Sequence, residues 1–332
     1  MSRREGEIAT FLAACGWAGA DRAALAGDAS FRRYERLSRG GASVVLMDAP
    51  PAAEDIRPFL VVAAILAGHA YSAPRVIAAD AARGLALLED LGDDVFTRVL
   101  AAGGDERALY AIAVDLLIDL HRRPLPEAAL PPYDESRLQA EADLLLNWFL
   151  PAAAGRPVGE GVRAAWRASW EAALPLARRV PEALVLRDYH ADNLIWLPRR
   201  QELARVGLLD FQDAVIGPGL YDLVSLIEDA RRDLDPGVAD AMIARYRAAF
   251  PEIAGADFAD AYAVLGAQRN AKIVGIFTRL AKRDGKPRYL DALPRVWRHL
   301  EGDLAHPGLA PVAAWFAAQV PPSWRGRTPW AA

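Results

Sequence analysis

The chain of 332 residues has little of what marks several large classes of protein. Its single cysteine, Cys15, excludes an intrachain disulfide, and the apolar helical stripe around it predicts a core position. A net charge of −4 lacks the basic excess that favours binding to nucleic acid or anionic membranes. No apolar run approaches the length of a membrane span, and the charged start lacks the apolar core of a signal peptide, so a cytoplasmic location is expected.

Lysine is also scarce, and none occurs before Lys272. The sequence does contain enough apolar residues to form a large core, because the hydrophobic fraction is 53% and the charged fraction 25%. These values are typical of a globular protein with one large or two medium domains.

Two carboxylates and an amide lie at the ends of short apolar runs near the middle of the chain. Asp188 and Asn193 are five positions apart, and Asp210 follows the next apolar run. The runs predict buried strands over 184–186, 194–197 and 206–209, the last two joined by a turn. This arrangement would bring three oxygen donors together. Asp and Asn often flank strands simply because they favour turns, but the compound match indicates a kinase.

Phosphoryl transfer gives each of these residues a role, because it needs a base, metal ligands and a phosphate cradle. Asp188 is the candidate base that orients and deprotonates the acceptor hydroxyl. Asn193 and Asp210 are the candidate Mg²⁺ ligands. Gln212 either serves metal or substrate or is a turn residue. His190 either contacts the substrate or structures the loop.

The periodicity of apolar residues predicts an α+β, bilobal, protein-kinase-like fold. Residues 1–90 are expected to form a nucleotide-binding lobe with a small antiparallel sheet, and residues 91–332 a helical lobe with the catalytic loop and substrate site. The first lobe is predicted to have an opening helix, strands over 31–37, 43–48, 75–79 and 85–88, and a helix over 55–68. The second is predicted to have a helix around 109–120 and further helices near 135–149, 160–179, 219–232, 237–249, 257–283 and 287–304.

The turn before the first strand lies where a kinase places its phosphate-covering loop, although it is not rich in glycine. The candidate nucleotide contacts there are Ser30, Phe31, Arg32 and Arg33. The strand over 43–48 has no phosphate-binding lysine, so an arginine of the small lobe must substitute, and either Arg32 or Arg33 is a candidate. Solvated strand arginines are the alternative interpretation.

Three other segments carry weaker signals. The segment 87–92 is the expected interlobe hinge, in which the backbone at Glu89 and Leu91 would bind the adenine edge. Asp222 lies near a helix start and is expected to cap that helix or to hydrogen-bond the catalytic loop. The basic segment 268–288 is either a solvated helix face or an anion-binding wall.

The combination resembles the aminoglycoside phosphotransferase-like family of small-molecule kinases and, within it, the bacterial anomeric kinases of N-acetylmuramate and N-acetylglucosamine. The resemblance is carried by the segments 28–34, 46–51, 88–93, 186–197, 208–226, 268–270 and 283–286. One departure stands out: the family typically has His-Gly before the catalytic aspartate, where this chain has Leu186 and Arg187.

The resemblance implies ATP and Mg²⁺ as cofactors and transfer of phosphate to the anomeric hydroxyl of the amino sugar. The sugar 1-phosphate would then enter cell-wall recycling. Arg269 and Lys272 are the candidate cations for the carboxylate of muramate. The expected partners are the sugar and ATP, with no nucleic acid, membrane or obligate protein partner.

Two alternatives remain at this point. Another small-molecule kinase of the same family would act on an aminoglycoside, choline or homoserine, although the basic segment 268–288 disfavours a polycationic drug. A catalytically inactive pseudokinase would serve as a binding module, but the presence of Asp188, Asn193 and Asp210 together argues against it.

Overall fold

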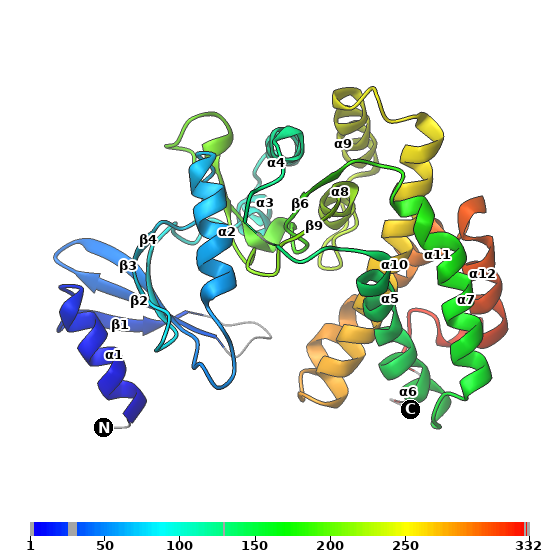
Figure 1. Cartoon of the computed structure of the whole chain (residues 1–332), viewed down its shortest axis with the longest axis horizontal. Coiled ribbons are helices and arrows are strands. Elements are labelled where there is room, and N and C mark those ends of the chain that lie inside the picture. Colours follow the sequence, from blue (N-terminus) through cyan, green and yellow to red (C-terminus); the bar gives the residue numbers. More distant parts are fainter. Residues whose placement is uncertain (1–2, 26–31, 129, 329, 331–332) are drawn as a thin grey trace. The chain divides into compact units, whose positions relative to one another are not determined.

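The computed structural model describes residues 3–25, 32–128, 130–328 and 330, and the chain forms two compact units (Figure 1). The first unit comprises Met1–Gly104 and Asp192–Asp213, and the second comprises Asp105–Ala191 and Ala214–Ala332. The first unit therefore extends past residue 90 to Gly104, and it also contains a segment from the middle of the sequence.

The first unit contains a five-stranded antiparallel sheet in the order β1-β2-β3-β5-β4. Its elements are α1 (Arg3–Ala14), β1 (Asp21–Ala24), β2 (Arg33–Arg39), β3 (Ala42–Asp48), α2 (Arg57–Gly68), β4 (Val76–Asp80), β5 (Leu85–Glu89), α3 (Phe96–Ala101), β7 (Leu194–Trp196) and β8 (Val206–Leu208). The small antiparallel sheet with one helix between its strands is confirmed. The edge strand β1 is missing from the sequence prediction, because all four of its residues are exposed and show no apolar alternation.

Helix α1 covers one face of this sheet. Its buried side chains Ile8, Phe11 and Leu12 form an apolar cluster with sheet residues that include Leu37 and Leu46. Cys15 is partly buried and packs against the edge of this cluster rather than within it.

The hairpin of β7 and β8 pairs with the N-terminal segments rather than with the helical unit. The Leu208 N–H donates to the carbonyl of Ser72 at 3.0 Å, and the Ser72 hydroxyl donates to the carbonyl of Ala204 at 2.6 Å. The Trp196 N–H donates to the carbonyl of Asp94 at 2.7 Å. These bonds satisfy buried backbone groups of both segments and explain why residues 192–213 belong to the first unit.

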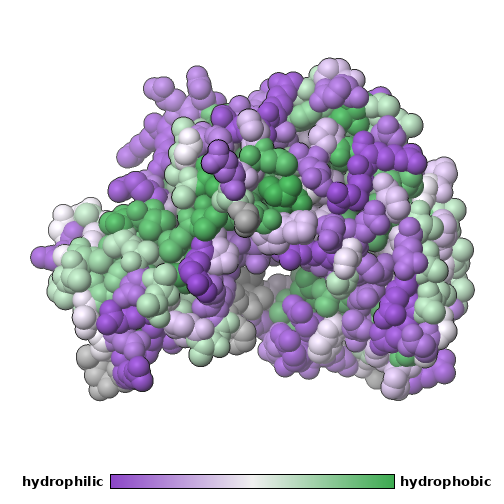
Figure 2. Space-filling view, viewed as in Figure 1, coloured by the Kyte–Doolittle hydropathy of each residue, from purple (hydrophilic) through white to green (hydrophobic). Residues whose placement is uncertain are grey.

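The second unit is mainly helical. Its elements are α4 (Glu106–Arg122), α5 (Glu135–Leu144), a π-helical turn (Leu145–Phe149), α6 (Leu150–Ala154), α7 (Glu160–Ala177), β6 (Glu182–Val185), β9 (Val215–Pro218), α8 (Leu220–Ile227), α9 (Pro236–Ala249), α10 (Gly255–Lys282), α11 (Leu293–Leu304) and α12 (Ala310–Gln319). None of the helices in the described part of the chain has the length and apolar character needed to cross a bilayer. Figure 2 shows hydrophilic side chains over much of the visible face of α7.

Helix α10 is the centre of this unit, and it packs against α5, α7, α8 and α11. Two of its glycines allow that close packing. A Cβ at Gly275 would lie 2.4 Å from the carbonyl oxygen of Leu144, and one at Gly266 would lie 2.6 Å from the carboxylate of Asp303. Larger residues at these positions would therefore force the neighbouring helices apart.

Several predicted elements differ in detail. The helix expected over 135–149 is α5 followed by the π-helical turn, and the one expected over 287–304 begins with a 3₁₀ segment, Pro287–Ala292. The strand predicted over 184–186 ends at Val185 and pairs antiparallel with β9, which was not predicted. β9 is short and ends in Gly217 and Pro218, so its sequence carries little strand signal.

Candidate active site

The loop that carries Asp188 is fixed by a buried carboxylate. Asp222, in the first turn of α8, is 0% exposed and accepts hydrogen bonds from the N–H groups of Leu186 and Arg187 at 2.6 and 2.8 Å. The Asp188 N–H closes a tight turn by donating to the carbonyl of Leu186 at 2.9 Å. The prediction that Asp222 hydrogen-bonds the catalytic loop is confirmed, and the backbone before Asp188 is held by charge-assisted bonds.

Arg187 occupies an unusual backbone conformation for its size, with φ of 71°. This left-handed region favours glycine and costs a residue with a side chain roughly 1 kcal/mol. The guanidinium is bound by the carboxylate of Glu141 in α5 and lies 5.6 Å from the centre of the Tyr133 ring. These contacts stabilise the strained turn immediately before Asp188.

Glu141 also anchors a second cation. The Lys272 ammonium lies 2.9 Å from the Glu141 carboxylate and 3.4 Å from the Tyr221 hydroxyl, and the Tyr133 hydroxyl donates to the same carboxylate. Burial alone would lower the pKa of Lys272, but Tyr221 and Glu141 outweigh it and raise that pKa. Burial would raise the pKa of Glu141, but Lys272 and Arg187 outweigh it and lower that pKa. All three groups are therefore charged.

The cluster of Glu141, Arg187 and Lys272 has one more cation than anion. The charge of Asp188 contributes to the raised pKa of both Arg187 and Lys272. Asp188 therefore lies close enough to both cations to interact with them electrostatically.

His190 and Arg269 are both buried in the second unit. The His190 Nε2 lies 3.0 Å from the Arg231 guanidinium, and burial followed by the charges of Arg231 and Arg269 holds the pKa of His190 well below its usual value. His190 is therefore neutral, which suits a role in structuring the loop. Arg269 donates to the carbonyl of Glu228 at 3.1 Å. A muramate carboxylate at Arg269 or Lys272 would have to compete with these internal partners.

The candidate metal ligands lie together in the first unit. The N–H of Leu209 donates to the carbonyl of Asn193 at 2.9 Å, which places Asn193 beside the residue that precedes Asp210. Asp210 has a left-handed φ of 57° and an exposed side chain, and its carboxylate accepts a hydrogen bond from Gln212 at 2.9 Å. A carboxylate and an amide oxygen are hard oxygen ligands of the kind that Mg²⁺ prefers. Asp188 belongs to the second unit, so the expected convergence of all three stays a prediction.

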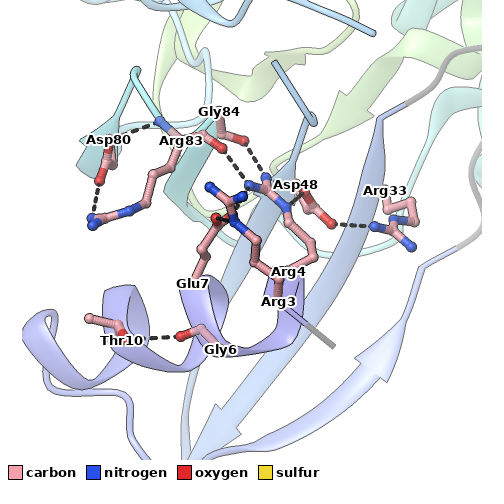
Figure 3. Close-up of polar contacts among 10 residues, drawn as sticks. All are labelled: Arg3, Arg4, Gly6, Glu7, Thr10, Arg33, Asp48, Asp80, Arg83 and Gly84. Carbon is pink, nitrogen blue, oxygen red and sulfur yellow. Dashed lines mark hydrogen bonds and ion pairs between the residues drawn. The ribbon is translucent and has the colours of Figure 1, made fainter. Parts of the chain in front are cut away.

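The two candidate phosphate-binding arginines have different surroundings. The Arg32 side chain is 6% exposed, and its guanidinium lies 2.7 Å from Glu54 and 3.8 Å from Asp210. The Arg33 side chain is 66% exposed and lies 2.8 Å from Asp48. Figure 3 shows Asp48 between Arg33 and Arg4 of α1, whose guanidinium donates to Asp48 at 2.8 Å. Ser30 and Phe31, the other two candidates of this loop, lie outside the described residues.

The expected hinge is braced by arginines of the first unit. Arg36 of β2 donates to both Asp90 and Asp93, with four bonds of 2.7 to 3.0 Å. The Glu89 carboxylate accepts from Arg200 at 2.6 Å, and Leu91 is half-buried. The backbone around Glu89 and Leu91 is therefore held in place, while its role in binding adenine stays a prediction.

Two residues of these networks were missed by the sequence reasoning. Glu54 lies in the loop before α2, and Glu141 lies on the polar-looking helix α5. Neither residue belongs to a motif, and only the folded structure shows that each forms an ion pair with an arginine. Only the scarcity of lysine pointed to arginine partners of this kind.

Comparison with known proteins identifies the family. A model of the phosphotransferase enzyme family matches residues 21–262. The chain belongs to the phosphotransferase enzyme family. The matched range includes Asp188, both candidate metal ligands and Arg32, whose roles stay predictions.

Two relatives of this phosphotransferase are similar over most of their length. An N-acetylmuramate/N-acetylglucosamine kinase from Caulobacter vibrioides is 41% identical, covering 96% of this chain and 98% of the relative. A protein of the same name from Pseudomonas aeruginosa is 38% identical, covering 88% of this chain and 86% of the relative.

Solved structures confirm the protein-kinase-like fold of this phosphotransferase. The choline kinase LicA from Streptococcus pneumoniae matches with a TM-score of 0.66 at 12% identity, covering 92% of this chain and all 100% of that one. The ADP-bound aminoglycoside phosphotransferase APH(2'')-Ib matches with a TM-score of 0.59 at 13% identity, covering 90% and 97%. At these identities the likeness concerns the fold alone.

Proposed function

We propose that this phosphotransferase transfers the γ-phosphate of ATP to the anomeric hydroxyl of N-acetylmuramate, N-acetylglucosamine or both. The product is the sugar 1-phosphate, which serves peptidoglycan recycling in the cytoplasm. The observation that carries the choice of substrate is the similarity to kinases of these sugars, at 36% to 41% identity over at least 83% of the chain. Nucleotide use is supported by the fold shared with an ADP-bound phosphotransferase.

Each candidate site residue has a separate role in this reaction. Asp188 orients the acceptor hydroxyl and accepts its proton, and the bonds from Leu186 and Arg187 to Asp222 hold the loop on which it lies. Asn193 and Asp210 hold Mg²⁺, which neutralises charge on the nucleotide phosphates when bound.

The anomeric hydroxyl suits a carboxylate base. It is more acidic than the other hydroxyls of the sugar, because the ring oxygen on the same carbon withdraws electron density. Asp188 follows Arg187 directly, and it belongs to the electrostatic surroundings of both Arg187 and Lys272. A carboxylate in this setting needs to remove the proton only late, as the new oxygen–phosphorus bond forms.

The test is a panel of amino sugars with ATP and Mg²⁺, with the position of phosphate on the product determined by phosphorus NMR. Methyl glycosides of the same sugars serve as matched controls, because only their anomeric oxygen is blocked. We expect phosphorylation of the free sugars and none of the methyl glycosides. Phosphorylated methyl glycosides would rule out the anomeric position.

A choline, homoserine or aminoglycoside kinase is the second candidate, because choline kinase and aminoglycoside phosphotransferase structures share the fold. The same panel includes these acceptors. Faster turnover of one of them than of either sugar would reassign the substrate while leaving the phosphotransferase chemistry in place.

A further inference from the structure

Arg32 and Arg33 are adjacent in sequence but have different surroundings, because Arg33 is the first residue of β2 and Arg32 directly precedes the strand. Arg33 pairs across β2 and β3 with Asp48, which is bound by Arg4 of α1. Arg33 therefore shares the face that α1 covers (Figure 3). Arg32 instead contributes to the electrostatic surroundings of Tyr34 together with Glu54 and Asp210.

The surroundings of Arg32 include both a carboxylate partner and the candidate metal ligand. Glu54, just before α2, lies 2.7 Å from the Arg32 Nε, and Arg32 also hydrogen-bonds the side chain of Tyr34. The Arg32 Nη2 lies 3.8 Å from the Asp210 carboxylate. The Phe211 ring stacks on Phe59 of α2 at 5.1 Å, which ties the Asp210 segment to the helix that follows Glu54.

This spot also has an excess of negative charge. Burial raises the pKa of Glu54; Arg32 opposes this, and the nearby carboxylates of Asp213 and Asp210 add to it. Three carboxylates, those of Glu54, Asp210 and Asp213, therefore lie around one arginine, and such a setting attracts further positive charge. A divalent cation at Asp210 would supply it, and phosphate oxygens would then bridge that cation and Arg32.

We infer that Arg32, oriented by Glu54, is the cation of this chain that binds the nucleotide phosphates, and that Arg33 is not. Protein kinases use a strand lysine paired with a helix glutamate for the same purpose. Here the equivalent strand, β3, has no lysine, and an arginine entering β2 takes the role from the neighbouring position. Arg33 instead binds Asp48, to which Arg4 of α1 also donates. The inference rests on the proposed function, because it requires a nucleotide phosphate as ligand.

The test measures binding of ADP with Mg²⁺ by calorimetry, without any sugar, in four variants. Arg32→Met should weaken binding roughly tenfold to a hundredfold, the range expected when a charged hydrogen-bond partner is lost. Arg32→Lys keeps the charge without the bidentate geometry and should lie between wild type and Arg32→Met. Glu54→Gln should weaken binding at least about threefold, because it releases the guanidinium from its orientation. Arg33→Met should bind like wild type.

Arg22 and Glu35 offer a matched control pair, because they form an ion pair on the same sheet with an Nε to Oε2 distance of 2.5 Å. Arg22→Met and Glu35→Gln make the same chemical changes there and should leave ADP binding unchanged. Thermal unfolding of each variant shows whether it is folded. If Arg32→Met is not, Arg32→Lys and Glu54→Gln carry the comparison.

Three outcomes separate this inference from the proposed function. Wild-type binding of ADP in Arg32→Met, or a loss in Arg33→Met alone, overturns the role of Arg32 and leaves the sugar kinase assignment standing. Weak ADP binding in Arg32→Met, with no sugar phosphorylated by wild type, supports Arg32 and overturns the choice of substrate. Absence of ADP binding in wild type overturns both.

Discussion

The carboxylate of Glu141 binds the guanidinium of Arg187, a residue whose backbone is left-handed and which directly precedes Asp188. The family that this chain resembles typically has glycine at this position, where a left-handed φ costs nothing. Here the strain of a larger residue is offset by an ion pair and by the ring of Tyr133. The departure from the family motif is therefore compensated by residues far away in the sequence.

The first prediction follows from that compensation. Glu141→Gln removes the charge that holds Arg187, so we expect kcat to fall roughly tenfold while the KM for ATP changes little. Arg187→Gly in the same background removes the strained residue and should restore part of the loss. Steady-state kinetics of the two single variants and the double variant measure this coupling.

Additive effects of the two substitutions on kcat would contradict the idea that Glu141 acts through Arg187. Glu135→Gln is a suitable control, because it makes the same change at the exposed start of α5. It should leave both kcat and the free energy of unfolding near their wild-type values.

The second prediction concerns the base. Asp188→Asn keeps the size of the side chain but removes the proton acceptor, so turnover should fall by at least about a hundredfold. ADP affinity should stay within about twofold, because Asp188 is assigned to the acceptor hydroxyl. A folded Asp188→Asn enzyme with near-normal turnover would exclude the assignment.

The third prediction concerns the metal. Asp210→Ala removes an anionic ligand and should weaken Mg²⁺-dependent nucleotide binding as well as turnover. Titration of Mg²⁺ at fixed ATP should show a midpoint shifted to higher concentration by about tenfold or more. If the midpoint is unchanged, Asp210 does not bind the metal.

The fourth prediction concerns a buried pair of carboxyl groups in the second unit. Asn270 of α10 donates to Glu228 at 2.7 Å and to Asp303 of α11 at 3.1 Å. Burial, followed by the charge of Glu228, raises the pKa of Asp303 well above its usual value. The folded protein therefore keeps a proton on Asp303 that the unfolded chain loses near pH 4.

The sign of the pH dependence follows from that proton. The contribution of Asp303 to stability is complete below its unfolded pKa and is lost as pH rises toward the folded pKa, with a slope of about 1.4 kcal/mol per pH unit. Asp303→Asn is neutral at every pH and lacks this slope. From about pH 5 to about pH 8, the free energy of unfolding measured with urea should therefore rise in the variant relative to wild type. Parallel curves would show that Asp303 is ionised in the fold.

The sequence was most informative where a local pattern determines the outcome. The antiparallel sheet and most helices followed from periodicity, and Asp222 was correctly assigned to the catalytic loop from its place at a helix start. The partners of Arg32 and Arg187 could not be predicted, because Glu54 and Glu141 lie 22 and 46 positions away. No regular spacing in the sequence marks an ion pair between residues so far apart.

The same limit explains why segment 268–288 remained ambiguous. Its basic residues indicated either a solvated face or an anion-binding wall, yet Arg269 and Lys272 are buried against Glu228 and Glu141. Periodicity alone places α10 as amphipathic, whereas this central helix is surrounded on several sides by other helices. A cation in such a helix is buried with a partner that only the fold supplies.

The bonds from Leu208 and Ala204 to Ser72 have a consequence for synthesis on the ribosome. The segment around Ser72, between α2 and β4, emerges long before the hairpin of β7 and β8 that completes its unit. The Ser72 hydroxyl and carbonyl of the nascent chain therefore lack their partners in the hairpin until the residues up to Asp213 have left the exit tunnel. Much of the helical unit's sequence, from Asp105 to Ala191, is translated during that interval, so the two units form in overlapping time rather than one after the other.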